Sequence, residues 1–221
     1  MKGRALLFDF DGVLVESEAA GNRQIADWLS ANGHPTTAAD SMANFMGLSG
    51  SAFTDAIERW IGGPLPAGFA EARAIEDARA LAEGVGAVAG AVDFVRSLPA
   101  DLPRAIVSSS STEWIRAHLA HLDLEGAFGD HLYSGREHVA HGKPAPDLYL
   151  YAADRLGVPI AQCAIIEDSF GGVTGAVKTG AYVVGLCAGT HCAADHAERL
   201  LALGADAVAA DFDEVAALLR R

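Results

Sequence analysis

Short segments rich in apolar residues recur along the chain, and polar or glycine residues end most of them. They lie at residues 5–8, 104–107, 131–134, 163–166, 182–185 and 207–208. From residue 91 onward, segments with apolar residues at helical spacing separate them, at 91–98, 112–122, 146–156, 171–179 and 214–219. Strands that alternate with helices are typical of an α/β fold, so the pattern predicts a doubly wound, mostly parallel sheet.

The segment between the first two predicted strands has a different pattern. Residues 17–85 contain no convincing strand, and helices are expected at about 18–32, 51–61 and 69–83. A glycine-rich stretch, 84–90, follows them. We therefore predict an α/β core domain formed by residues 1–16 and 87–221, with a small helical domain, residues 17–86, inserted after the first strand.

Composition narrows the function classes. The 221 residues are 51% hydrophobic and carry a formal net charge of −13, which argues against nucleic acid and anionic membranes as partners. No apolar run approaches the roughly 20 residues of a membrane span, and the N-terminus shows no signal-peptide pattern. Three sparse cysteines fit a reducing compartment, so we expect a cytoplasmic protein. A monomer or weak homo-oligomer is the working expectation.

Two carboxylates follow the first strand. Asp9 and Asp11 are two residues apart, so on an extended backbone both side chains face the same spot. Two buried acids repel each other unless a cation lies between them, and oxygen ligands suit Mg²⁺. An alternative is that Asp11-Gly12 simply forms a hairpin turn, and the two interpretations are compatible.

Polar residues also end other predicted strands. Ser108 ends the second strand, Glu167 and Asp168 end another, and Lys143 lies in a loop before a helix. Ligands of open α/β sheets bind beyond the carboxyl ends of the strands, where these segments meet. Taken singly, each has a structural explanation: the serines at 109–111 as helix caps, Lys143 as a loop charge, and 167–168 as a turn. Their joint occurrence at one edge favours a functional site.

These segments resemble the four motifs of the haloacid dehalogenase superfamily, in order and in spacing. The resemblance spans the whole chain and is strongest to the branch of β-phosphoglucomutase and sugar-phosphate phosphatases. It implies that the α/β core is the catalytic domain and that the helical insertion, residues 17–86, is the family's small cap domain. The segments that carry the resemblance are Asp9-Phe10-Asp11-Gly12-Val13, Ile106-Val107-Ser108, Gly142-Lys143-Pro144 and Ile165-Ile166-Glu167-Asp168-Ser169.

The resemblance implies a role for each residue. Asp9 is expected to be the nucleophile and Asp11 the general acid/base, acting through an aspartyl-phosphate. The phosphate is expected to be bound by Ser108, Ser109 and Lys143. Mg²⁺ is expected to be bound by Asp9, the main-chain carbonyl of Asp11, and Asp168, with Glu167 in support.

The reaction class follows from the acid at position 11. Phosphatases and mutases of this superfamily carry an acid there, whereas dehalogenases lack it and need no metal. Gly21 stands where β-phosphoglucomutase has a histidine, and Phe45-Met46 stands where the mutase has a nearby arginine. Both departures favour a Mg²⁺-dependent phosphatase of a small phosphorylated metabolite, with sugar phosphates as the preferred class. Substrate recognition is assigned to Gly47, Leu48 and Ser49 of the cap.

Two alternatives from other classes stay open at this point. A hexose phosphomutase uses the same covalent intermediate. A receiver-type signalling domain also combines acids, a hydroxyl and a lysine on a doubly wound sheet. However, receivers carry their acceptor aspartate in mid-chain and have no helical insertion, unlike Asp9 of this chain.

One further cluster combines thiols, imidazoles and a carboxylate over ten residues. It consists of Cys187, His191, Cys192, Asp195 and His196. The spacing matches no ordinary zinc motif, so a mobile loop with surface histidines is the favoured interpretation over a zinc site.

Overall fold

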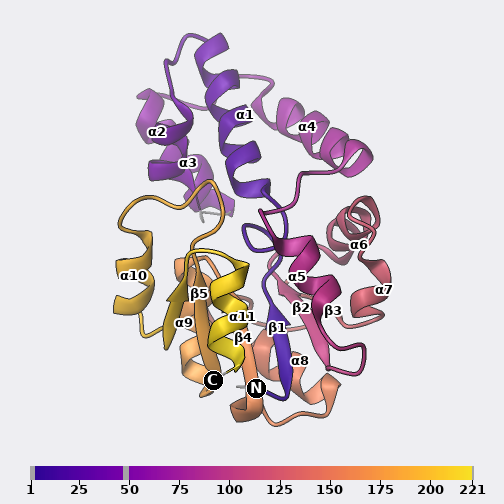
Figure 1. Cartoon of the computed structure of the whole chain (residues 1–221). Helices are drawn as coiled ribbons and strands as arrows, with labels where there is room; N and C mark the ends of the chain where they lie inside the picture. Colours follow the sequence, from indigo (N-terminus) through magenta and orange to yellow (C-terminus); the bar gives the residue numbers. More distant parts are fainter. Residues whose placement is uncertain (1–2, 47–49, 221) are drawn as a thin grey trace. The chain divides into compact units, whose positions relative to one another are not determined.

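Six parallel strands form the centre of the larger part of the molecule (Figure 1). The computed structural model describes residues 3–46 and 50–220. The strands are β1 (Ala5–Phe8), β2 (Arg104–Ser108), β3 (Leu132–Ser134), β4 (Cys163–Glu167), β5 (Tyr182–Leu186) and β6 (Ala207–Ala209). Their order is β3-β2-β1-β4-β5-β6, which reverses between β1 and β4. Such a reversal opens a crevice at the carboxyl ends of the central strands.

Helices cover both faces of this sheet, which explains why the strands read as continuous apolar runs. Leu6 and Phe8 point into one core with α5 (Ala91–Ser97), α6 (Thr112–His121), α7 (Glu125–Phe128) and α11 (Phe212–Arg220). Ala5 and Leu7 point into the other, with α8 (Asp147–Leu156), α9 (Phe170–Ala176) and α10 (His196–Ala202). Short 3₁₀ turns, η1 (Ile160–Gln162) and η2 (Val177–Thr179), complete the chain. The predicted fold class is confirmed.

Residues 17–85 form a helical unit of their own. It contains α1 (Ser17–Ala31), α2 (Ala38–Phe45), α3 (Gly50–Ile61) and α4 (Phe69–Glu83). The core of this unit consists of Ile25, Leu29, Phe45, Ala56, Ile57 and Phe69. Backbone contacts gather the chain into two compact units, residues 1–16 with 86–221 and residues 17–85. Their assignment as catalytic and cap domains is a proposal.

The structure corrects the interpretation of the segment after β5. The histidines there are not surface residues, because His191 is 5% exposed and His196 is 3% exposed. His196 also begins α10, a helix that the sequence analysis did not predict. Its side chain packs against Phe170, with ring centroids 4.8 Å apart, so this histidine is part of the folded interior.

None of the helices at 3–46 and 50–220 combines the length and the apolarity that crossing a bilayer requires.

Candidate active site

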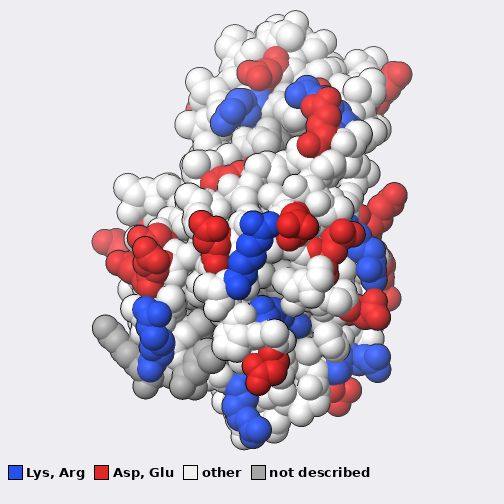
Figure 2. Space-filling view, turned by 45° about the vertical axis from the view of Figure 1, so that its right-hand side comes forward, with Lys and Arg blue, Asp and Glu red and all other residues white. Residues whose placement is uncertain are grey.

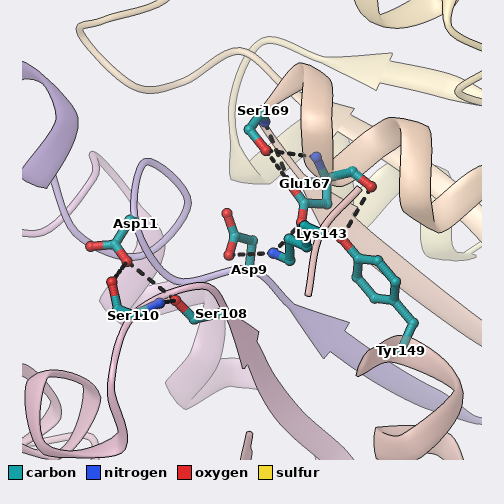
Figure 3. A network of polar contacts seen from close by, with 9 residues as sticks. Asp9, Asp11, Ser108, Ser110, Lys143, Tyr149, Glu167 and Ser169 are labelled. Atoms are coloured by element: carbon teal, nitrogen blue, oxygen red, sulfur yellow. Dashed lines mark hydrogen bonds and ion pairs between the residues drawn. The ribbon is translucent and has the colours of Figure 1, made fainter. Parts of the chain in front are cut away.

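Asp9, Lys143 and Glu167 form a buried network at the sheet's carboxyl edge (Figure 3). The backbone N–H of Asp9 donates to the carbonyl of Ile166 at 2.9 Å, which extends the strand pairing by one residue and sets Asp9 beside Glu167. The Nζ of Lys143 lies 2.7 Å from Asp9 Oδ1 and 2.5 Å from Glu167 Oε1. All three side chains are at most 8% exposed, so one ammonium serves two desolvated carboxylates.

Glu167 has further partners that fix its carboxylate. The Tyr149 hydroxyl donates to Oε1 at 2.6 Å, and the Ser169 hydroxyl donates to Oε2 at 3.1 Å. Gly172 lies against the same group, because a Cβ there would be 2.0 Å from Oε2. The first turn of α9 must therefore carry a glycine for Glu167 to take this position.

Burial and the neighbouring charges both shift the pKa values of Asp9 and Lys143. Burial raises the pKa of Asp9 well above its usual value, and the negative charge of Glu167 raises it further, against the lowering effect of Lys143. Burial by itself would lower the pKa of Lys143, but the carboxylates of Asp9 and Glu167 outweigh it and raise that pKa. The ammonium is thus held in its charged form beside the predicted nucleophile.

Asp9, Glu167 and Asp168 together offer a place for a cation. One carboxylate oxygen from each lies within 4.8 Å of the others, and all three residues are buried. When all are ionised, Lys143 compensates one of their three negative charges, so the set suits a divalent ion with a preference for oxygen ligands. Gly12, with φ +79°, gives Asp168 room: a Cβ at that position would lie 2.0 Å from Asp168 Oδ2. The donor chemistry therefore fits the expected Mg²⁺.

Asp11 has different partners from Asp9. Its Oδ2 accepts hydrogen bonds from the hydroxyls of Ser108 at 3.2 Å and Ser110 at 2.6 Å (Figure 3). Its Oδ1 accepts the indole N–H of Trp114 at 3.0 Å. The loop after β1 turns back at once, with the N–H of Leu14 donating to the Phe10 carbonyl at 2.8 Å. Asp11 thus lies in a compact turn, and its carboxylate faces neutral donors.

The remaining predicted residues are placed as follows. Ser109 is exposed, and its role in phosphate binding stays a prediction. Ser111 caps α6 by accepting the N–H of Trp114 at 3.2 Å, as the capping interpretation expected. Gly47, Leu48 and Ser49 lie outside the described residues. Phe45, next to them, is 1% exposed and belongs to the core of the helical unit.

Sequence analysis missed several residues that touch the site. Ser110 and Trp114 contact Asp11, Tyr149 contacts Glu167, and His191 Nε2 lies 2.8 Å from Asp168 Oδ2. The signal for Ser110 was present in the run of four serines after β2. The other three come from a helix or loop where only the folded chain brings them to the acids.

The charges on the protein surface provide little long-range attraction for a phosphate. Figure 2 shows lysine and arginine side chains interspersed with aspartate and glutamate on the visible face. The net charge of the chain is −13, so an anionic ligand must rely on cations held close to it. Lys143, whose side chain is 6% exposed, is such a cation.

Comparisons with known proteins show the family of the chain. A family model described as haloacid dehalogenase-like hydrolase matches residues 4–180. Hexitol phosphatase A of Escherichia coli strain K12 is 30% identical over 195 residues, which cover 83% of each chain. The 6-phosphogluconate phosphatase of the same organism is 27% identical over 188 residues, 85% of this chain and 84% of the relative. A solved HAD family hydrolase from Deinococcus radiodurans R1, with bound phosphate and sodium, has a TM-score of 0.87 at 32% identity and covers 99% of this chain and 96% of its own.

Proposed function

Because the chain belongs to the haloacid dehalogenase-like hydrolase family, we propose that it is a Mg²⁺-dependent phosphatase of a small phosphorylated metabolite, with a sugar or sugar-alcohol phosphate as substrate. The observation that carries the proposal is the Asp9–Lys143–Glu167 network beside Asp11. It combines a nucleophile, a cation and a second acid at one sheet edge. The names of the relatives supply the substrate class.

Asp9 is the proposed nucleophile. One carboxylate oxygen attacks phosphorus and forms an aspartyl-phosphate, while the bond from phosphorus to the substrate oxygen breaks. Lys143, 2.7 Å from Asp9, offsets the repulsion between this carboxylate and the anionic phosphate. The Ser108 hydroxyl, at the end of β2, is a donor for a phosphoryl oxygen once Asp11 leaves it.

Asp11 is the proposed general acid/base. Its protonated carboxyl gives a proton to the leaving alcohol, and the carboxylate then takes a proton from the water that attacks the aspartyl-phosphate. This second attack regenerates Asp9 and releases inorganic phosphate. Hydrogen bonds from Ser108, Ser110 and Trp114 fix the position of this carboxylate.

Asp9, Asp168 and the main-chain carbonyl of Asp11 are proposed to hold Mg²⁺, with Glu167 in support. Bound there, Mg²⁺ supplies electrostatic stabilisation of the phosphoryl oxygens. Cytoplasmic localisation and a monomeric or weakly oligomeric state stay predictions from the sequence.

The test is phosphate release from a panel of sugar phosphates, sugar-alcohol phosphates and nucleotides in the presence of Mg²⁺. We expect Asp9→Asn to abolish turnover and the covalent intermediate. Asp11→Asn should slow turnover by roughly 10²–10⁴-fold, yet with a nitrophenyl phosphate it should still accumulate phosphate on Asp9, because that leaving group needs little protonation. Rapid-quench mass spectrometry locates the label. Full activity in Asp9→Asn, or label on a serine, would overturn the assignment, and conversion to an isomeric sugar phosphate without release would indicate a mutase.

A further inference from the structure

His191, Cys192 and His196 gather nitrogen and sulfur donors between β5 and the start of α10. One such atom from each lies within 4.8 Å of the others. Both histidines are buried, and Cys192 is half-buried. Their rings lie nearly perpendicular, with centroids 5.8 Å apart. This is a different donor chemistry from the carboxylates of Asp9, Glu167 and Asp168.

The spacing between two of these donors matches that of ligands on one ion. His191 Nε2 and Cys192 Sγ lie 3.5 Å apart. Bonds of about 2.0 Å to nitrogen and about 2.3 Å to sulfur, at a tetrahedral angle, put the two ligand atoms roughly 3.5 Å apart. An ion could therefore bind both atoms with little movement of either side chain.

The ring of His196 is fixed by a hydrogen bond. Its Nε2 lies 2.6 Å from the carbonyl oxygen of Asp168, and because a carbonyl only accepts, Nε2 carries the proton. The lone pair is then on Nδ1. Histidines that bind metals commonly donate their other N–H to a backbone carbonyl in this way, which fixes the ring.

We propose that His191, Cys192 and His196 form a binding site for a divalent transition-metal ion such as Zn²⁺, distinct in its ligands from the carboxylate set expected to bind Mg²⁺. Imidazole and thiolate donors favour ions of the Zn²⁺ type over Mg²⁺, which prefers oxygen. Cys187 lies close by, since its thiol is hydrogen-bonded to that of Cys192.

Occupation of this site has a consequence for the carboxylate set. His191 Nε2 lies 2.8 Å from Asp168 Oδ2, and a nitrogen that binds a metal cannot also donate a proton to that carboxylate. The ion therefore removes one of the contacts that orient Asp168. This consequence rests on the proposed function: Zn²⁺ should inhibit phosphate release even when Mg²⁺ is saturating.

Binding is tested with Co²⁺ as a spectroscopic substitute, in excess Mg²⁺ that occupies the carboxylate set. We expect the wild-type chain to develop a thiolate-to-Co²⁺ charge-transfer band that saturates at one equivalent. Cys192→Ser should lose the band and bind Co²⁺ at least about tenfold more weakly. The matched control is Cys163→Ala, since Cys163 is the first residue of β4, at the opposite end of that strand from Glu167, and it should keep the band. No band in wild type, or a band that disappears only in Cys187→Ser, would overturn the site.

Inhibition is a separate readout. The Zn²⁺ concentration that halves phosphate release should rise at least about tenfold in Cys192→Ser and stay unchanged in Cys163→Ala. Equal inhibition in all three chains would show that Zn²⁺ acts at the carboxylates instead and would refute the regulatory consequence. If the chain released no phosphate from any substrate, the proposed function would fail, while the Co²⁺ band would still decide the metal site.

Discussion

Replacement of Lys143 by methionine tests the electrostatics of the acidic network. The variant keeps an unbranched side chain but leaves Asp9 and Glu167 without the ammonium that lies 2.7 Å and 2.5 Å from them. Removing one partner of a buried ion pair costs about 3–5 kcal/mol of stability, because an uncompensated charge stays buried. For a chain of 221 residues, with about 2–4 °C per kcal/mol, this corresponds to a fall in Tm of roughly 6–20 °C.

The loss of stability in Lys143→Met should depend on pH in a defined direction. The folded-state pKa of Asp9 is already raised, by burial and then by Glu167, so folding becomes less favourable as pH rises through it. Without Lys143, this pKa rises further. The Tm of the variant should therefore lie furthest below that of wild type at neutral pH. The difference in Tm should shrink on acidification as Asp9 takes up a proton.

Thermal melts followed by circular dichroism, without and with Mg²⁺, measure both effects. Lys178→Met is the matched control, because Lys178 is exposed and its Nζ contacts the Pro144 carbonyl at 3.1 Å. It should change stability by less than about 0.5 kcal/mol. If Lys143→Met melted within two degrees of Lys178→Met at pH 7, Lys143 would not compensate the buried charge and the argument would be refuted.

Three further expectations follow from the same contacts. Chelation of the metal should abolish phosphate release. In thermal melts, Mg²⁺ at about 100 times its Kd should stabilise wild type by about 2.7 kcal/mol, and it should not stabilise Asp168→Asn. Trp114→Phe removes the 3.0 Å bond to Asp11, so kcat should fall roughly tenfold to 150-fold for an alkyl phosphate and much less for a nitrophenyl phosphate; equal losses would contradict a role in proton transfer. Burial lowers the pKa of His118, so the unfolded chain binds its proton more readily and stability should decline as pH falls below about 6.5. In urea melts His118→Gln should show a shallower decline, and an unchanged pH profile would contradict this cause.

The sheet and the polar residues at its carboxyl edge could be predicted because short stretches of sequence determine them. A buried parallel strand needs apolar residues on both faces, and the chain must place polar residues where the strand ends. Asp9, Ser108 and Glu167 each stand at such an end, in or next to β1, β2 and β4. Parallel pairing alone then brings them to one edge, so little long-range information is needed.

Contacts that depend on tertiary packing could not be predicted. Trp114 lies 103 residues from Asp11, and on α6 it reads as an ordinary apolar position of a helix. Tyr149 likewise reads as a core aromatic of α8, and only its hydroxyl contact with Glu167 shows a second role. The helix α2 was missed for a local reason: it is eight residues long, and Phe45 is its only large buried side chain. Its capping box, Thr37 with Asp40, was the available signal.

The two aspartates after β1 look equivalent in the sequence but have different surroundings in the folded chain. An extended backbone would turn both carboxylates to one spot, but the chain pairs with β4 only as far as Asp9 and then turns. Asp9 is therefore left among charged groups, where its state depends on Lys143 and on any cation that the neighbouring acids bind. Asp11 instead accepts hydrogen bonds from two hydroxyls and an indole. On the proposed mechanism, Asp9 attacks beside Lys143, which offsets the charge of the phosphate, whereas Asp11, held by Ser108, Ser110 and Trp114, transfers the proton.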